Sequence, residues 1–429
     1  MDLLARLLWR PGSAVNLAVL RITLCVVLFG SAALDAISGR DSVEDLPTIA
    51  PRILGSALVV LPREQLTLRI VAALLALCCI AGALGYRTRW AMVGVLIFGA
   101  YHLGVPQIFG KVDHDHHILW IALILSLAPC GDALSIDAWG RRPAASIRYG
   151  FPLRASWLVL GLAYFFAGFW KLGSIGLDWV TAENLRGILW DERLARGSGF
   201  TPMIDIASSD PLLTAGAAFT VAFELGFVFL VFNRRTRPLA VIAGLLFHCS
   251  TGMTMGIWFT GFTIFYVAFI DWDSHLGRIE TGRGAQRRRP SPPDQHRPAL
   301  VAITLTGLLV FGVLAAGFGR EINGWPVASY PDFGYRSSAT KITAALRVDG
   351  DAAEDRVLVG LSSLERHRLL LRAASTEQGR EALVALVERS PVCDGSAPTV
   401  ELVTIRWRVD SAGLTLAEEL PEPLVVTCS

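Results

Sequence analysis

A succession of long apolar segments dominates this chain and limits what it can fold into. Several of them are long enough to cross a lipid bilayer, which takes about 20 residues of α-helix. A backbone inside lipid must satisfy its own hydrogen bonds, so we expect these segments to be helices. Charged residues make up only 18% of the chain, against about 25% in a typical soluble domain. The sequence therefore predicts an all-α polytopic membrane protein.

We expect about nine transmembrane helices. The fourth of them is short, so part of the polar cluster just before it, residues 111–117, is expected to enter the membrane-embedded protein. The expected spans cover approximately residues 15–34, 66–84, 90–105, 118–128, 157–171, 211–232, 239–251, 257–270 and 299–318.

The basic residues of the connecting loops predict how the chain is oriented in the membrane. With nine spans, the basic loops all fall on one side, and cytoplasmic loops are typically enriched in lysine and arginine. The N-terminus is therefore expected in the cytoplasm and the C-terminal region outside it. The loops in question contain Arg6 and Arg10, Arg87 and Arg89, Arg141 to Arg154, Arg234 to Arg237, and Arg278 to Arg297.

The chain divides into four parts by composition. They are a transmembrane domain at 1–272, a basic proline-rich cytoplasmic linker at 273–298, a last transmembrane helix at 299–319 and a small extracytoplasmic α+β domain at 320–429. The last part alternates strand-like runs at 340–348 and 400–409 with a helical run around 364–387. Its Cys393 and Cys428 lie in a compartment where disulfides persist, so we expect them to be paired, with two free thiols as the alternative.

Lys171 interrupts the fifth apolar segment close to its end. An ammonium inside hydrocarbon costs a few kcal/mol or more, so it must find a partner, lose its proton or reach the headgroups. The simplest interpretation is that Lys171 snorkels to the interface. The functional interpretation is a buried amine that acts as a base, because burial favours the neutral form of an amine.

Histidines are expected at the same membrane depth as Lys171, toward the extracytoplasmic side: His114, His116 and His117 precede the fourth span, and His248 lies in the seventh. Glu224 lies in the interior of the sixth span. Polar residues at membrane depth indicate a functional site, so we expect Lys171, His116 and His248 to converge on one cleft between the fourth, fifth and seventh spans. For Glu224 the alternative is simple pairing with Arg21 or a backbone group.

The cluster Asp113–His117 has the residue types of an iron or zinc site. Membrane desaturases use several such histidine boxes, whereas this chain has one, and His102 and His248 are isolated in the sequence. The alternative is a polar loop in which Asp115 caps the fourth helix. We therefore expect no metal.

Five stretches, in order, are similar to one known family. The central one runs from Tyr164 to Leu172 and continues at Asp178–Val180; the others are Leu17–Arg21, Gly82–Arg87, Asp115–Trp120 and Phe247–Ile257. Together they resemble the HTTM (horizontally transferred transmembrane) domain family, which includes the vitamin K-dependent gamma-glutamyl carboxylases. The resemblance covers about residues 15–272.

The resemblance implies a reaction and a set of site residues. Enzymes of this kind oxidise a reduced naphthoquinone with O2, remove a proton from a glutamate and add CO2; menaquinol is the expected quinol. Lys171 matches the lysine that deprotonates the hydroquinone, His116 and His248 match supporting histidines, and Glu224 matches an acid. The ring is expected against the aromatic residues Phe165, Phe166, Phe169, Trp170 and Trp179.

The chain also departs from the animal carboxylases. They have two adjacent lysines in the central motif, where this chain has Trp170 before Lys171, and a large luminal region where this chain is short. These departures argue against peptide recognition of the animal-carboxylase kind, so a small acid is an alternative to a peptide as the expected substrate. Alternatives are a non-carboxylating quinol-linked oxidoreductase and a membrane transport or structural component.

The expected surroundings follow from the same features. The composition, rich in arginine and alanine, favours a bacterial plasma membrane. Membrane lipid and quinone are the expected partners, and nucleic acid is not.

Overall fold

The structure is a computed structural model that describes most of the chain. It divides into two compact units, which are treated separately: residues 1–170, 222–246 and 259–332 form the first, and residues 171–221, 247–258 and 333–429 the second. The described residues are 7–38, 52–108, 115–139, 141, 143–196, 200–281, 297–321, 324–330, 333–352, 357–358, 363–388, 390, 399–410 and 413–427.

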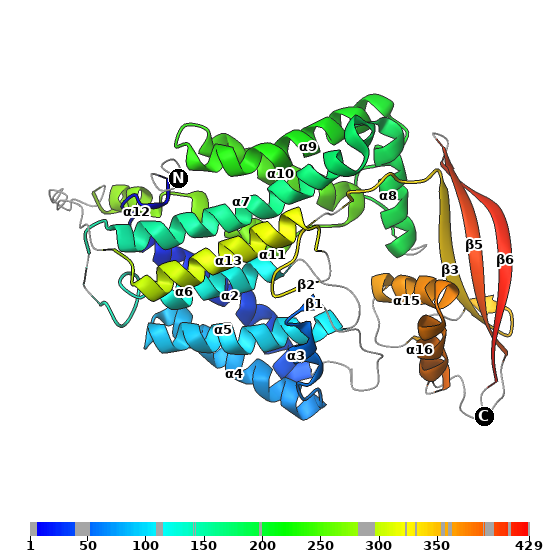
Figure 1. Cartoon of the computed structure of the whole chain (residues 1–429), viewed down its shortest axis with the longest axis horizontal. Helices are drawn as coiled ribbons and strands as arrows, with labels where there is room; N and C mark the ends of the chain where they lie inside the picture. The colour runs from blue at the N-terminus through cyan, green and yellow to red at the C-terminus, as the bar shows by residue number, and fades with distance from the viewer. Residues whose placement is uncertain are drawn as a thin grey trace. The chain divides into compact units, whose positions relative to one another are not determined.

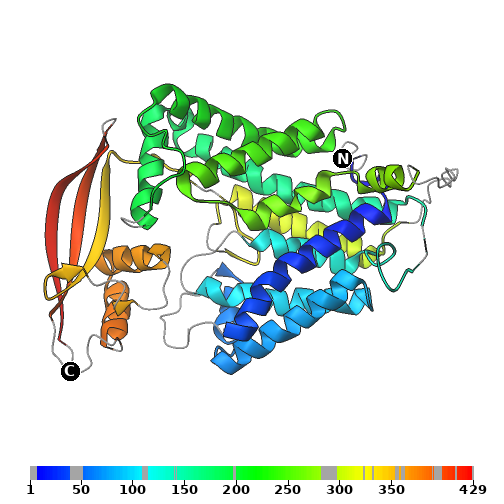
Figure 2. The ribbon, with the colours of Figure 1, turned by 180° about the vertical axis from the view of Figure 1, so that it is seen from behind.

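Most of the first unit is helical, as Figures 1 and 2 show. Figure 2 shows α2 running alongside α4. Three helices, α7, α9 and α10, continue across the boundary into the second unit. The long helices are α2 (Ala14–Ser38), α4 (Gln65–Leu84), α5 (Thr88–Gly104), α6 (His116–Leu127), α7 (Ile147–Ile175), α9 (Asp210–Phe232), α10 (Arg237–Met255) and α13 (Leu300–Phe318). The shorter ones are α3 (Gly55–Val59), η1 (Val105–Ile108), α11 (Thr260–Thr263), η3 (Ile264–Phe269) and α12 (Trp272–Thr281).

Seven helices of the described chain are long and apolar enough to cross a membrane. The expected count of about nine is not confirmed, because the fourth and eighth expected spans are short. They correspond to α6, with 12 residues, and to the segment formed by α11 and η3, with 10 residues. At 1.5 Å per residue, α6 is about 18 Å long, whereas the hydrocarbon core is about 30 Å thick.

Five connections nevertheless lie at the same end of the first unit. They are the segment before α2, the α4–α5 turn, the α6–α7 loop, the α9–α10 turn and the segment after η3. Contacts between them include Gly12 N to Ser146 O (2.9 Å), Ile136 N to Leu84 O (3.0 Å) and Asp273 N to Asn16 Oδ1 (3.1 Å). At the α9–α10 turn, Arg237 Cζ lies over the ring of Trp157 in the first half of α7 (4.1 Å). These are the same connections that were expected on one side because of their basic residues. Since the chain enters α6 and the α11–η3 segment at the opposite end and leaves each of them at this end, both segments lead from one end of the unit to the other.

At the opposite end of the first unit, the segment that follows α13 folds back over the ends of the helices. Strand β2 (Gly324–Trp325) pairs in parallel with β1 (Arg52–Ile53). Just beyond it, the indole N–H of Trp120 in α6 donates to the carbonyl of Pro326 over 2.9 Å. The chain that leaves α13 therefore covers the beginning of α6.

The second unit contains α8 (Ala182–Arg196) and the C-terminal α+β domain. The antiparallel sheet has the order β4–β3–β5–β6, with bounds Asp351–Ala352, Thr340–Val348, Thr399–Asp410 and Gly413–Thr427. Helices α15 (Ser363–Ser375) and α16 (Glu377–Glu388) cover one face (Figure 1). Leu346 of β3 and Leu402 of β5 pack there against Leu370 and Leu383. The predicted strands and α+β class are thus confirmed.

The single helical run expected around 364–387 is two helices. Thr376 explains the break, because its Oγ1 accepts a hydrogen bond from the backbone N–H of Gly379 over 3.1 Å and so caps α16. Cys393 and Cys428 lie outside the described residues, and their disulfide stays a prediction.

Candidate functional site

Lys171 lies near the C-terminal end of α7, where its side chain is buried with only 2% of its surface exposed. Its Nζ lies 5.3 Å from the centre of the Trp179 ring. That placement suits a cation–π contact, in which the negative face of an aromatic ring attracts an ammonium. The structure differs from the snorkelling interpretation, because the Lys171 side chain ends beneath the Trp179 ring in the protein interior.

Trp179 closes the short helix η2 (Gly176–Trp179) and is 2% exposed. Its indole N–H donates to the carbonyl of Phe333 over 2.7 Å. A tryptophan ring that is buried and hydrogen-bonded at its edge presents a fixed face. The structure therefore brings together two of the predicted site residues, Lys171 and Trp179.

Lysine is rare throughout this chain, which sets Lys171 apart. The full sequence has 39 basic residues, of which only Lys111, Lys171 and Lys341 are lysines. Lys341 is also buried, at 4% exposed, and Lys111 lies outside the described residues. Arginine is always charged in proteins, whereas lysine can lose its proton. The scarcity of lysine is a signal in the sequence that the motif comparison did not use.

The aromatic residues of α7 separate into two groups. Phe165 and Phe169 are half-buried and stack with ring centres 5.9 Å apart. Phe166 is 1% exposed and packs on α13, where a Cβ on Gly317 would lie 2.1 Å from its ring. Trp170 donates its indole N–H to the carbonyl of Gly317 over 2.7 Å. Phe166 and Trp170 therefore join α7 to α13.

Helix geometry also separates Lys171 from the half-buried pair. Tyr164 precedes Lys171 by seven residues, close to two turns of helix, so the two share a face of α7. Phe165 and Phe169 lie on another face. The ring that the structure brings to the amine is Trp179.

Tyr164 is the centre of a buried aromatic cluster. Its hydroxyl lies 2.7 Å from the hydroxyl of Tyr266, and both side chains are buried. Phe223, Phe227 and Phe262 surround the Tyr164 ring with centres 4.7 to 5.0 Å away. The sequence reasoning missed this hydroxyl pair, because Tyr266 lies in an apolar run with no motif around it.

Glu224 is 3% exposed and lies where α9 comes very close to α7. A Cβ on Gly168 would lie 2.9 Å from the Glu224 Cβ, so only glycine permits this approach. The alternative prediction was that Glu224 pairs with Arg21, but the structure shows other partners for Arg21. The guanidinium of Arg21 donates instead to the carbonyls of Cys130 and Leu134, each over 2.6 Å.

His116 and His117 open α6, and both are buried. His117 Nε2 lies 2.9 Å from the carbonyl oxygen of Gly261, which can only accept, so this nitrogen carries the proton. His117 thus links α6 to α11. The ring of His116 lies edge-on to Tyr330, with centres 6.2 Å apart. His114 and Asp113 lie outside the described residues.

His248 lies in α10, is 3% exposed and has Phe247 beside it, with ring centres 5.2 Å apart. It belongs to the second unit with Lys171, whereas His116 belongs to the first. The convergence of Lys171, His116 and His248 on one site therefore stays a prediction.

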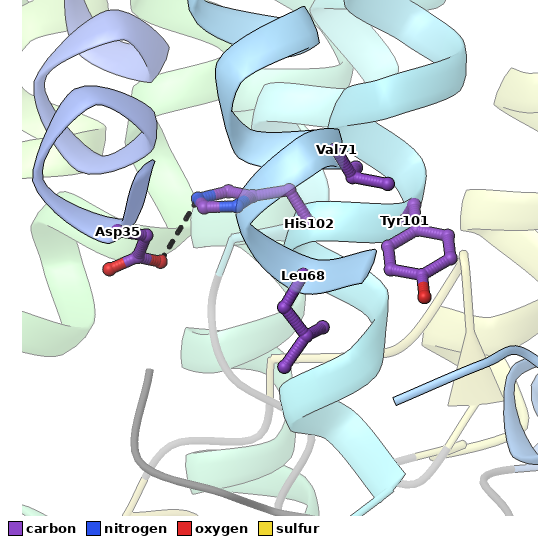
Figure 3. Close-up of a pocket in the computed structure, with 5 residues that line it drawn as sticks. All are labelled: Asp35, Leu68, Val71, Tyr101 and His102. Carbon is purple, nitrogen blue, oxygen red and sulfur yellow. Dashed lines mark ion pairs between the residues drawn. The ribbon is translucent and has the colours of Figure 1, made fainter. Parts of the chain in front are cut away.

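A small pocket lies between α2, α4 and α5 of the first unit, lined by Asp35, Leu68, Val71, Tyr101 and His102 (Figure 3). His102 Nε2 lies 3.7 Å from an Asp35 carboxylate oxygen and 3.3 Å from the Ser31 hydroxyl. His102 is isolated in the sequence but has an acidic neighbour in the fold. Ser31 and Asp35 are four residues apart in α2, which puts both on the face toward His102.

A family model described as the HTTM domain matches residues 9–271, which is more than half of the chain. The match includes all five stretches that carried the resemblance. No curated protein and no solved structure matches the chain.

Proposed function

Because the chain belongs to the HTTM domain family, we propose that this multi-pass membrane protein is an enzyme of the gamma-carboxylase type. It would couple the oxidation of a reduced vitamin K-type naphthoquinone by O2 to removal of a proton from a glutamyl or other carboxylic-acid substrate, followed by addition of CO2. The quinol in a bacterial plasma membrane would be menaquinol.

The burial of Lys171 is the observation that carries this proposal. A lysine whose amine lies inside the protein, in a chain that otherwise uses arginine almost throughout, is suited to take up and release a proton. We assign Lys171 Nζ the role of accepting the proton from a quinol hydroxyl. The Trp179 ring then lies against the ammonium that the transfer produces, which the face of the ring stabilises.

The residues around the amine suit a flat apolar ligand. When bound, a reduced naphthoquinone supplies the two electrons that reduce O2. Trp179 offers an aromatic face beside the amine. Phe165 and Phe169 form a half-buried aromatic pair on another face of α7, and in this proposal they guide the quinol from the bilayer toward the site.

His116 and Glu224 have supporting roles in this proposal. An imidazole N–H of His116 or His248 would donate a hydrogen bond to the oxygen on which negative charge develops. Glu224, buried where α7 and α9 meet, would relay a proton away from the site. The basic end of the first unit would face the cytoplasm, as the positive-inside rule requires.

One observation favours a second candidate, a quinol-linked oxidoreductase that does not carboxylate. Trp170 stands where the animal carboxylases have a second lysine, and here it joins α7 to Gly317 of α13. A site with one amine in this motif would retain the quinol step and lack whatever the second amine contributes to carboxylation.

Oxygen uptake by the purified protein tests the first step. The protein is reconstituted in lipid nanodiscs, supplied with reduced menaquinone and followed with an oxygen electrode, with labelled CO2 and a glutamate peptide present. We expect uptake that disappears in Lys171→Ala and partly returns when a small amine is added. Uptake without incorporation of label would favour the second candidate. Equal uptake by Lys171→Ala and the native protein would exclude Lys171 as the base.

A further inference from the structure

We propose that residues 333–341, here called the strap, position Trp179 over Lys171, so that the C-terminal domain is a working part of the Lys171 site. The strap precedes β3 and extends into its first residues. All the residues concerned belong to the second unit. The proposal rests on the proposed function of Lys171, and the experiment below is independent of it.

The first step in the argument is that the strap fixes the Trp179 ring by its edge. The carbonyl of Phe333, at the start of the strap, accepts the hydrogen bond from the Trp179 indole. Next to it, the guanidinium of Arg336 pairs with the carboxylate of Asp178, the neighbour of Trp179. The ring that covers the Lys171 amine is therefore held by a segment of the C-terminal domain.

Asn184 fixes the backbone of the same tryptophan. Its side chain is 3% exposed; its amide N–H donates to the Trp179 carbonyl over 3.5 Å, and its Oδ1 accepts from the Ser337 backbone N–H over 2.7 Å. Asn184 thus bridges Trp179 and the strap. With both the indole and the backbone attached, the ring has little freedom to turn away from Lys171.

The far end of the strap is held on α8 by a polar cluster in which Ser337 and Lys341 are buried and Asp191 is half-buried. Ser337 Oγ donates to one carboxylate oxygen of Asp191 over 2.8 Å, and Lys341 Nζ lies 2.9 Å from the other. A Cβ on Gly187 would lie 2.5 Å from Ser337 Oγ, so the strap seats against the backbone of α8. Removing Asp191 would leave the buried Lys341 ammonium without this carboxylate, which is costly, so this end stays in place.

The three attachments form one continuous path. It leads from the Lys171 amine to the Trp179 ring, through Phe333 and Asn184 to Ser337, and on to Asp191 and Lys341. A cation–π contact needs the ring face turned to the cation, and the strap sets that orientation. Asn184, Ser337 and Asp191 are positioning residues, since they act on Lys171 through Trp179.

Scarcity of lysine makes a direct test practical. An amine-reactive acetylating reagent can modify only three lysine side chains, and peptide mass spectrometry separates Lys171 from Lys111 and Lys341 in one digest. We expect Asn184→Ala to raise the acetylation rate at Lys171 by roughly fivefold to tenfold, the factor that matches loss of about one hydrogen bond. The rate at Lys111 is the internal reference and should not change.

Two further variants complete the experiment. Trp179→Phe keeps an aromatic ring but loses the bond to Phe333, and it should also raise the rate at Lys171. Glu419→Gln, which removes an exposed partner of Arg347 on the sheet, is the matched control and should leave that rate unchanged. If Asn184→Ala and Trp179→Phe are folded by gel filtration and Lys171 is acetylated at the native rate in both, the proposal is wrong. If Asn184→Ala fails to fold, Trp179→Phe decides alone.

The experiment needs neither quinol nor O2. An increase at Lys171 in the variants supports the strap even if no oxygen uptake is found, and oxygen uptake without that increase would leave the proposed function standing while overturning the strap.

Discussion

Arg21 in the first unit and Lys171 in the second are both buried cations near or within a membrane-spanning helix, but their surroundings differ. The Arg21 guanidinium donates to backbone carbonyls, most closely to those of Cys130 and Leu134. The Lys171 ammonium instead meets the face of Trp179. Arg21 is thus held by backbone carbonyls, whereas Lys171 lies against a ring that the C-terminal domain holds.

The two surroundings suit different roles: a structural role for the buried Arg21 and a chemical role for the buried Lys171. A guanidinium cannot lose its proton in a protein and presents a rigid fork of donors, which suits a group that joins a helix to a loop. An amine can lose its proton, and a ring face attracts its charged form without accepting a strong hydrogen bond. Exchanging the two residue types in turn should therefore damage stability in one unit and chemistry in the other.

Lys171→Arg should give the largest effect. Arginine keeps the positive charge and can stack on Trp179, but it cannot accept a proton, so quinol-dependent O2 uptake should fall by about 10²- to 10⁴-fold, the usual contribution of a general base. The melting temperature should stay close to that of the native protein. Activity within tenfold of native would show that the charge of Lys171, and not its basicity, matters.

His116→Ala should lower turnover by about 10²-fold, typical for loss of a positioned donor to a developing oxyanion. His114→Ala is the comparison, because His114 falls outside the family motif, and its effect should be much smaller. The measurement is steady-state O2 uptake at saturating quinol. Equal effects of the two substitutions would show that His116 is not part of the site.

Arg21→Lys should destabilise the protein without changing its chemistry. An ammonium cannot span both carbonyls, so at least one buried acceptor is left unpaired at a cost of about 1–3 kcal/mol. Thermal unfolding in detergent measures this. Arg89→Lys, an exposed change in α5, is the control and should stay within about 0.5 kcal/mol of native. A native melting temperature for Arg21→Lys would contradict the structural role.

Asp137→Ala should have the smallest effect, about 1 kcal/mol, the usual cost of losing a helix cap. Asp137 accepts hydrogen bonds from the Arg87 and Thr88 backbone N–H groups at the start of α5. Burial works to raise the pKa of this carboxyl, but the bonds from Thr88 and Arg87 outweigh it and lower the pKa.

The lowered pKa gives Asp137 a pH signature. Its contribution to stability should be complete above the unfolded pKa of about 3.9 and disappear as the pH falls through the folded value. Unfolding of native protein and Asp137→Ala at several pH values measures it. A difference in melting temperature that is constant from pH 7 to below pH 4 would contradict the assignment.

Much of this architecture could be predicted from the sequence, because a chain inside lipid must form helices that satisfy their own backbone hydrogen bonds. The apolar runs predicted the long helices, and the basic loops predicted which connections share an end of the first unit. The alternation of residues 340–348 and 400–409 predicted β3 and β5. The two short segments were harder, since hydropathy cannot distinguish a full span from a 12-residue helix such as α6 that is mostly covered by protein.

The surroundings of Lys171 were only partly readable. The motif predicted Lys171 and Trp179, which do lie together. It also grouped Phe166 and Trp170 with the ring site, whereas contacts with Gly317, some 150 residues away in the sequence, assign them to packing against α13. Asn184, Ser337 and Asp191 belong to no motif, and only the fold brings them together.

The parallel pairing of β1 with β2 has a consequence for the order of assembly during synthesis. Arg52 pairs with Gly324, so 272 residues, the difference between 324 and 52, must be made before the pair can form. At about 5–20 residues per second, that takes roughly 14–54 seconds. The Tyr330 hydroxyl that meets the backbone N–H of His117 at 3.3 Å emerges later still. The beginning of α6, with His116 and His117, is therefore completed only after α13 and the segment that follows it have been synthesised.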